Sequence, residues 1–386
     1  MDIDRALITK YAKEALKLTV KLAEVNSHNE NPEGISEVIG KIVPLLQILG
    51  FDNEVVDNRN IYAKRIGSGK KIIMLGHMDT AFDKHSAFKN IWIENNILHG
   101  PGVSDMKGGI ALMLAGLNYL QAKGQLKGKE IGLLLNSDEE SGSLLSRDLI
   151  SKKAKDYELA LIFEGGNRID NKTTTYLNTR RGSGNVSFKI YGKTANIALN
   201  PQDGISAAEE MAFKMIESAK LSNLAKNTVI NINEDMGLGA YKKGNIPDFA
   251  HFNIEFRYSS VEELNRIDAA FKNITHMHFV ENIHGETAVT RSEFKIHRPA
   301  MIPDKDALFF SSIFENSAEK MNYKIVQKSR TGGSDGCFTS NAGTPTIDGI
   351  GPVGGKWHTD EEYTEIDSFE KRLELFLRFI YEISGE

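Results

Sequence analysis

Cysteine is almost missing from this sequence, since Cys337 is the only one among 386 residues. One cysteine cannot form an internal disulfide, so the fold depends on its apolar core, as is common in a reducing compartment. No segment reaches the roughly 18 consecutive apolar residues that a membrane helix needs. Residues 1–25 form an amphipathic pattern without the apolar core and cleavage site of a signal peptide. We therefore expect a cytoplasmic protein without a membrane partner.

An excess of positive charge is also absent. Lysine and arginine number 47 against 52 aspartates and glutamates, which gives a net charge of −5, and the two signs are interspersed. This differs from the basic surface of nucleic-acid-binding proteins, so no nucleic acid is expected as a partner. An acidic stretch near the end, Asp360 to Glu362 followed by Glu365 and Asp367, is predicted to be a solvated loop.

What the chain does contain is typical of a globular protein with a sizeable core, with 40% apolar and 26% charged residues. Its outer parts alternate helices with short apolar strands, which favours an α/β fold with a mostly parallel sheet covered by helices on both faces. Helical spacing occurs at 4–24, 34–49, 106–123, 306–322 and 368–384, and strand-like runs occur at 61–65, 71–76, 131–135, 159–163, 324–326 and 346–350.

The middle of the chain has a different pattern. Its predicted order is strand, helix, two strands, helix and strand, which is the ferredoxin-like arrangement. The segments are 182–192, 204–220, 228–233, 249–258, 261–271 and 277–280. We therefore predict a small α+β domain at 182–292, inserted into a catalytic domain made of residues 1–181 and 293–386.

Histidine and acidic residues follow the apolar strands of the larger predicted domain. Each could be structural alone: His77 as a hydrogen-bonded strand end, for example, or Asp105 as a helix N-cap. Together they form a set suited to two divalent cations about 3.5–4 Å apart, because parallel strands end at one edge of a sheet. Imidazole with carboxylate favours zinc, with cobalt or manganese as alternatives. The candidates are His77, Asp105, the three consecutive acids Asp138, Glu139 and Glu140, then Glu164 and His358.

The motifs in this order resemble one known family. They are GHMDT, GPGVSDMKGG, SDEESGS, FEGG, YGKT, GNIPDF, TGGSDG and GTPTIDGIGPVGGKWHT. The chain resembles the co-catalytic zinc metallopeptidases that include glutamate carboxypeptidase, acetylornithine deacetylase, succinyl-diaminopimelate desuccinylase and aminoacylase, and it is most similar to the glutamate carboxypeptidase branch. The resemblance implies hydrolysis of a peptide or N-acyl amide bond in a small substrate with a free carboxylate. It also implies a homodimer formed through the inserted domain.

The resemblance assigns a role to each metal ligand. His77 and Glu164 would bind one metal, Glu140 and His358 would bind the other, and Asp105 would bridge the two.

Two further residues and one peptide bond complete the implied catalytic centre. Asp79 would orient His77, and Glu139 would be the general base that takes a proton from the attacking water. The peptide bond between Asp105 and Met106 would be cis, as in that family.

The resemblance also implies a substrate-binding set. Asn245 belongs to this set. Arg257, further along the small domain, would help bind a substrate carboxylate, and Gly354 and Gly355 would donate backbone N–H groups to it. One position departs from the family pattern: Asn196 stands where a histidine normally contacts the oxyanion. Asn196 could keep that function through its amide, and His251 is another candidate.

Two other functions are compatible with parts of the sequence. A catalytically weak or inactive metal-binding homologue is the alternative that Asn196 leaves open. A serine hydrolase is the other, because residues 332–336 match Gly-x-Ser-x-Gly, with Asp348 and His358 following in order. The strand that should precede Ser334 is polar, however, and the acidic motifs would then have no role.

Overall fold

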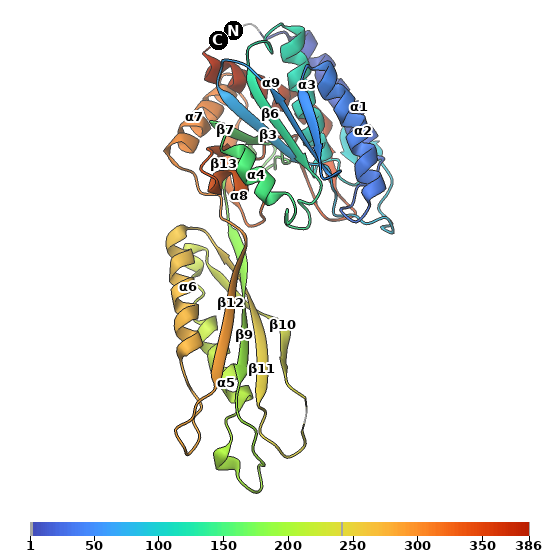
Figure 1. The fold of residues 1–386 in the computed structure, drawn as a ribbon. Helices are drawn as coiled ribbons and strands as arrows, with labels where there is room; N and C mark the ends of the chain where they lie inside the picture. Colours follow the sequence, from blue (N-terminus) through green and yellow to red (C-terminus); the bar gives the residue numbers. More distant parts are fainter. Residues whose placement is uncertain (1–2, 241, 386) are drawn as a thin grey trace. The chain divides into compact units, whose positions relative to one another are not determined.

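The computed structural model describes residues 3–240 and 242–385. The chain divides into two compact units, one formed by Met1–Arg180 with Met301–Glu386 and the other by Arg181–Ala300. The larger unit is therefore discontinuous in sequence, and the smaller one is a single inserted segment (Figure 1).

The central sheet of the larger unit is mixed. Its strand order is β1-β2-β6-β3-β7-β14, in which β6, β3, β7 and β14 run parallel and β1 and β2 add an antiparallel edge. The strands are β1 (Asp52–Val56), β2 (Asn60–Arg65), β3 (Lys71–His77), β6 (Glu130–Asn136), β7 (Leu159–Ile162) and β14 (Thr346–Ile347). The predicted α/β fold with a mostly parallel sheet is confirmed.

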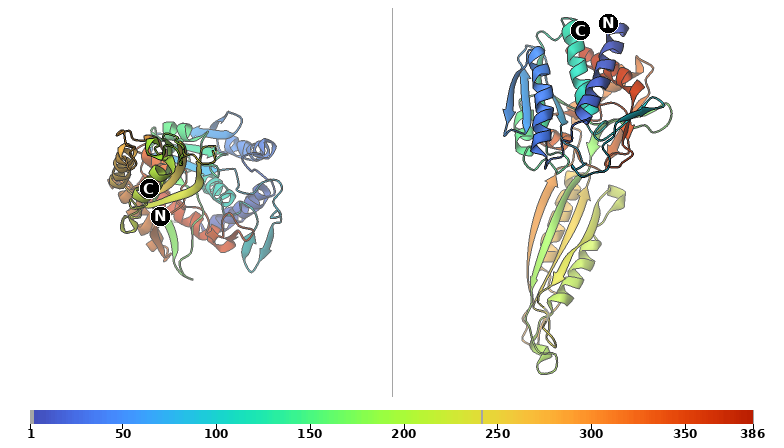
Figure 2. Two further views of the ribbon diagram at one scale, coloured as in Figure 1. Left: turned by 90° about the horizontal axis from the view of Figure 1, so that it is seen from below. Right: turned by 90° about the vertical axis from the view of Figure 1, so that its right-hand side faces the viewer.

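Helices cover both faces of this sheet, as Figures 1 and 2 show. In β3, Ile72 and Met74 face the core under α1, α2, α3, α7 and α9, whereas Ile73 and Leu75 face a smaller core under α4 and α8. This explains why β3 has no apolar–polar alternation. The helices are α1 (Arg5–Ala23), α2 (Pro32–Ile48), α3 (Lys107–Ala122), α4 (Arg147–Ala154), α7 (Lys305–Glu319), α8 (Gly336–Asn341) and α9 (Ile366–Ser384).

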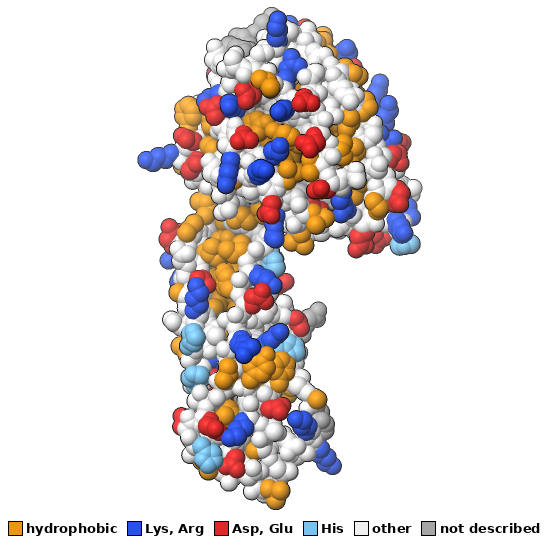
Figure 3. Space-filling model, viewed as in Figure 1, with side chains coloured by type: hydrophobic (Ala, Val, Ile, Leu, Met, Phe, Trp, Pro, Cys, Tyr) orange, Lys and Arg blue, Asp and Glu red, His pale blue; other side chains and the backbone are white. Residues whose placement is uncertain are grey.

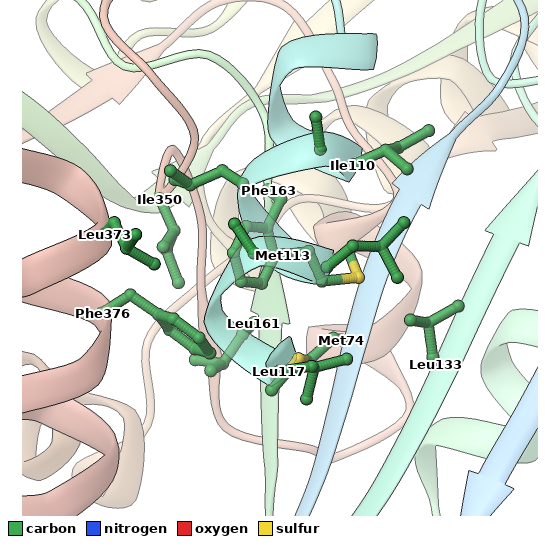
Figure 4. Packing of buried hydrophobic residues seen from close by; sticks show 14 of the residues in the cluster. Met74, Ile110, Met113, Leu117, Leu133, Leu161, Phe163, Ile350, Leu373 and Phe376 are labelled. Atoms are coloured by element: carbon green, nitrogen blue, oxygen red, sulfur yellow. The ribbon is translucent and has the colours of Figure 1, made fainter. Parts of the chain in front are cut away.

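Helix α3 lies at the centre of the larger core and begins directly after the loop that carries Asp105. Its side chains pack between the strands and α9, with Met113 near Leu161 and Phe376 (Figure 4). Glycine allows this close approach: a Cβ on Gly109 would lie 1.8 Å from the carbonyl oxygen of Phe163. The loop before α3 is thereby held against the end of β7.

Two smaller sheets complete the larger unit. One has the order β15-β16-β5-β4, and the other pairs β8 with β13. Their strands are β4 (Trp92–Glu94), β5 (Ile97–His99), β8 (Thr174–Arg180), β13 (Ile325–Arg330), β15 (Gly354–Gly355) and β16 (Tyr363–Glu365).

The smaller unit has the predicted strand–helix–strand–strand–helix–strand order. Its antiparallel sheet runs β10-β11-β9-β12, and one face packs with both helices into a separate core. Along β11, alternate residues from Ala250 to Tyr258 are buried, and those between them form the more open face. The elements are β9 (Gly182–Tyr191), α5 (Ala207–Ala219), β10 (Val229–Leu238), β11 (Phe249–Tyr258), α6 (Val261–His276) and β12 (Val289–Arg298).

The last predicted strand of this unit was misplaced. Residues 277–280 form an irregular segment in which the N–H groups of Phe279 and Val280 donate to the Glu210 carboxylate at 2.9 and 3.0 Å. The actual strand, Val289–Arg298, lies at the sheet edge and is mostly exposed, so its apolar pattern is weak. The unit consequently extends to Ala300, past the predicted boundary at 292.

The surface carries both signs of charge, as the sequence composition indicates. Charged side chains of both signs are scattered over the face seen in Figure 3. Across the described residues, every helix is too short or too polar to span a membrane.

We predict opposite changes in the free energy of unfolding when two helical glycines are each replaced by alanine. Gly109→Ala should lower the free energy of unfolding by about 1–3 kcal/mol, because the new methyl group overlaps a backbone oxygen. Gly40→Ala in α2 should raise it by up to about 1 kcal/mol, because open space surrounds that position and alanine favours the helix. Urea unfolding midpoints test both, and equal shifts would contradict the packing described for α3.

Candidate active site

The topology brings the predicted ligands together at one edge of the central sheet. His77 ends β3 and pairs in register with Asn136, which ends β6, while Leu75 pairs with Ile162, which ends β7. All three strands are parallel, so their carboxyl ends and the loops that follow them meet at this edge. Those loops carry Glu139, Glu140 and Glu164.

Asp79 determines which nitrogen of His77 faces the site. The Nδ1 atom of His77 lies 3.1 Å from the Asp79 carbonyl oxygen and 3.4 Å from its carboxylate Oδ1. A carbonyl oxygen can only accept, so Nδ1 carries the proton and Nε2 faces the cluster. The other carboxylate oxygen of Asp79 accepts the N–H of Glu140 at 3.0 Å. Asp79 therefore positions two of the predicted ligands at once.

The two oxygens of Asp105 face different partners. Its Oδ1 lies 3.1 Å from Nε2 of His77, which is also 3.6 Å from Oε1 of Glu164. Its Oδ2 lies 3.2 Å from Nε2 of His358, which is 3.1 Å from Oε2 of Glu140. Asp105 therefore lies between two donor sets, each with one histidine and one glutamate. The resemblance groups the same residues into the same two pairs, and their binding of metal stays a prediction.

The close approach of these groups shifts their pKa values. Burial and the negative charge of Asp105 raise the pKa of Glu140 to about 7, and the same two causes raise the pKa of Glu164 well above its usual value. Burial would also raise the pKa of Asp105, but hydrogen bonds from both histidines outweigh it and hold that pKa far below the usual range. Hydrogen bonds to Asp105 and Glu140 raise the pKa of His358 to about 11.

These shifts reflect the mutual repulsion of carboxylates at one site. Positive charge placed among the carboxylates would let all of them ionise. Oε1 of Glu140 is buried and has no hydrogen-bond partner among the described residues, so it is available as a ligand atom. Candidate ligand atoms of His77, Asp105 and Glu140 all lie within 4.8 Å of one another. The donor set therefore fits divalent metal ions.

The three consecutive acids of the loop after β6 have different roles. The carboxylate of Asp138 accepts the N–H groups of Leu145 and Ser146 at 2.7 and 3.3 Å, which shapes the loop. Glu140 belongs to the cluster. Glu139 lines a cavity of about 420 Å³ beside it. Only two of the three acids therefore lie at the site.

This cavity lies entirely within the larger unit. It combines Glu139 and three predicted ligands with two arginines and a glycine-rich turn. The lining residues are Asp105, Glu139, Glu164, Arg180, Arg330, Thr331, Gly332, Gly333, Trp357 and His358. The sequence patterns did not indicate either arginine.

Glu362 is a second component that the sequence patterns missed. The stretch containing it was predicted to be a solvated loop, and that is wrong for Glu362, which is 1% exposed. Its carboxylate accepts the backbone N–H groups of Gly102, Ser104 and Asp105 at 3.0, 2.9 and 3.0 Å. It thus fixes the loop that presents Asp105. The Asp105–Met106 peptide bond in this loop is cis, as the resemblance implied.

The role predicted for Gly354 needs correction. Its N–H donates to the carbonyl oxygen of Gly166 at 3.0 Å, so the donor that was assigned to substrate is already used. A Cβ at this position would lie 2.2 Å from Oγ of Ser104, which explains the glycine by close packing. Gly355 is buried beside it in β15, and its predicted contact with substrate stays a prediction.

The other predicted substrate-binding residues belong to the smaller unit. Asn196 and Asn245 pair with each other in an isolated antiparallel bridge. Oδ1 of Asn196 accepts the N–H groups of residues 198 and 199 at 2.9 and 3.2 Å. His251 lies 3.7 Å from Asp235. Arg257 lies on the more open face of the sheet.

The serine hydrolase alternative fails on geometry. Ser334 is fully buried, and its Oγ donates to Asp348 at 2.6 Å. His358, which would have to take the serine proton, instead contacts Asp105 and Glu140. The Gly-x-Ser-x-Gly match is therefore a structural turn.

Comparison with known proteins identifies the family. A profile of the peptidase family M20/M25/M40 matches residues 73–382, which includes every predicted ligand. The chain belongs to this family. It is therefore a hydrolase that cleaves peptide or amide bonds with the help of metal.

Individual relatives agree with this assignment. Over 391 aligned residues the chain is 28% identical to carboxypeptidase G2 of Pseudomonas sp. (strain RS-16), covering 96% of this chain and 89% of that protein. The fold is similar to that of aminopeptidase PepT from Bacillus cereus, with a TM-score of 0.74, 20% identity and coverage of 96% and 98%. It is also similar to a dinuclear metal-binding M20 peptidase from Bacillus subtilis, with a TM-score of 0.69, 14% identity and coverage of 99% for both chains.

We predict that Glu362→Ala weakens metal binding without unfolding the protein. Loss of the acceptor for three N–H groups should loosen the loop that holds Asp105 and reduce cobalt affinity about 10- to 100-fold, as for other groups that orient metal ligands. Calorimetric titration of the apoprotein with Co²⁺ measures this. Glu361→Ala, at an exposed neighbouring acid, is the matched control. Equal affinities of the two variants would contradict the role of Glu362.

Proposed function

We propose that this protein is a two-metal exopeptidase or deacylase that acts on small peptides or N-acyl amino acids bearing a free carboxylate. The observation that carries the proposal is the position of Asp105, whose two carboxylate oxygens face two separate histidine–glutamate pairs. A carboxylate in this position is suited to bridging two cations.

The proposed ligand sets follow from these contacts. His77 and Glu164 would hold one ion, His358 and Glu140 the other, and Asp105 would contact both. Two histidines with three carboxylates favour zinc, with cobalt and manganese as alternatives. The name of the Bacillus subtilis peptidase, which describes it as dinuclear metal-binding, supports a pair of ions. Such ions supply Lewis acidity and lower the pKa of a nearby water to about 7.

The protein's own residues would then transfer the proton of the attacking water and orient the ligands. Glu139 lines the cavity next to Asp105 and follows Asp138, whose contacts fix the loop. We assign Glu139 as the base that takes the proton of the attacking water and returns it to the leaving amine. Asp79 would keep His77 in the tautomer that directs Nε2 to a metal.

The free carboxylate of the substrate is supported by a relative. Carboxypeptidase G2 is by its name a carboxypeptidase, and the alignment with it covers 96% of this chain. In the smaller unit, Arg257 supplies a guanidinium suited to such a group. We propose that this unit acts as a lid over the cavity and as the surface of a homodimer.

Asn196 supports activity more than inactivity. Its carbonyl oxygen already accepts two backbone N–H groups. This fixes the orientation of the side chain and leaves the amide N–H₂ as a donor. We therefore propose that Asn196 donates to the oxyanion in place of a histidine.

Metal removal and Glu139→Gln together test the proposed function. A chelator should abolish hydrolysis of dipeptides and N-acyl amino acids, and Zn²⁺ or Co²⁺ should restore it and raise the melting temperature. Glu139→Gln should bind the same number of ions but lose about 10²- to 10⁴-fold in kcat, because the base is gone. Activity in the chelated protein, or in the glutamine variant at the wild-type rate, would refute the mechanism.

A further inference from the structure

Arg330 stands out among the cavity residues because its charge has no carboxylate partner. It ends β13 and lines the cavity with Glu139 and His358. Within the described part of the chain it forms no ion pair. Burial and the charge of Arg180 lower the pKa of Arg330, and the charges of Asp348, Glu164 and Asp105, which lie beyond ion-pair distance, only partly oppose this shift. A group of this kind is suited to binding an anion.

Arg180, the other arginine of the cavity, already forms hydrogen bonds with other residues of the larger unit. Its Nε donates to Asp348 at 2.6 Å, and one terminal nitrogen donates to the carbonyl oxygens of Gly332 and Gly333 at 3.1 and 2.9 Å. These contacts neutralise Arg180 and fix the glycine-rich turn in the cavity wall. Of the two guanidinium groups, Arg330 therefore has the larger capacity for a ligand.

Arg330 is held in place by residues adjacent to two metal ligands. Its guanidinium lies 4.1 Å from the centre of the Trp357 ring, and a terminal nitrogen donates to the carbonyl oxygen of Gly165 at 3.2 Å. Trp357 precedes His358, and Gly165 follows Glu164. The indole is fixed in turn, because its Nε1 donates to Ser104 at 2.9 Å. Stacking immobilises the guanidinium plane and leaves other N–H groups to donate.

We infer that Arg330, supported by Trp357, binds the carboxylate of the substrate inside the larger unit, in addition to the help proposed above from Arg257. This inference deepens the proposed function and rests on it. Because the supporting residues adjoin metal ligands, the bound carboxylate must lie close to the scissile amide. The substrate class is therefore a short amide with a carboxylate a few bonds from the cleaved C–N bond, such as an N-acyl amino acid or the C-terminal residue of a dipeptide.

A substrate pair with and without charge tests the inference. The metal-loaded protein is assayed with N-acyl amino acids and with the corresponding carboxamides. Arg330→Gln should lower kcat/KM for the acids about 10- to 100-fold, the size expected for a charge-assisted hydrogen bond, and change it less than about threefold for the amides. Arg330→Lys should recover part of the loss. Lys328→Gln, which removes a charge from an exposed position of the same strand, is the matched control.

The outcomes separate this inference from the proposed function. If the wild type cleaves acids and amides equally well, the carboxylate specificity of the proposed function is wrong, and the inference fails with it. If the wild type prefers acids and Arg330→Gln keeps that preference, the inference alone is overturned. Unchanged cobalt affinity and melting temperature in the variant establish that the site is intact.

Trp357 offers a readout that does not depend on turnover. The chain has two tryptophans, so Trp92→Phe leaves Trp357 as the only emitter. In that background, N-acetylglycinate should change the fluorescence and neutral N-acetylglycinamide should not, because only the anion is drawn to the stacked guanidinium. Adding Arg330→Gln should remove the response to the acid. Equal responses to both compounds, or a response that survives Arg330→Gln, would overturn the assignment.

Discussion

Repulsion between carboxylates at the end of the central sheet is the constraint on which the rest of the site depends. Asp105, Glu140 and Glu164 are drawn to one edge by the parallel strands and by the loop before α3. Burial and mutual repulsion hold the pKa of each glutamate above its usual value. An arrangement of this kind is costly unless positive charge enters it, which supports the proposal that these residues bind metal.

The ligand side chains of this cluster are oriented by buried carboxylates that would not themselves bind metal. Asp79 connects His77 to the backbone of Glu140, and Glu362 holds three N–H groups of the loop that carries Asp105. Each is a carboxylate that satisfies buried donors, so each stabilises the fold and orients a ligand with the same hydrogen bonds. The burial of Glu362 raises its pKa to about 8 together with the nearby charge of Asp105, while the three donors act in the opposite direction.

The parts predictable from sequence are those that follow from strand ends. Apolar runs fix where β3, β6 and β7 end, and parallel topology then brings His77 and the glutamates together without further information. Contacts between residues far apart in the chain leave no such pattern in the sequence. In the sequence, Glu362 is one of several acids in a polar stretch, and its partners lie some 260 positions away. Arg330 ends a polar strand, and the edge strand β12 is too exposed to show alternation.

Charge balance relates the metal cluster to the choice of substrate. Two divalent ions would neutralise the four carboxylates of Asp105, Glu139, Glu140 and Glu164, with both histidines neutral as ligands, and Asp348 neutralises Arg180. The guanidinium of Arg330 is then the one positive charge left over among these groups. A substrate with a single carboxylate near the scissile bond would balance it, whereas a neutral amide would leave the half-buried guanidinium without a carboxylate partner. Electrostatics would thus favour monoanionic substrates before any contact from the smaller unit is made.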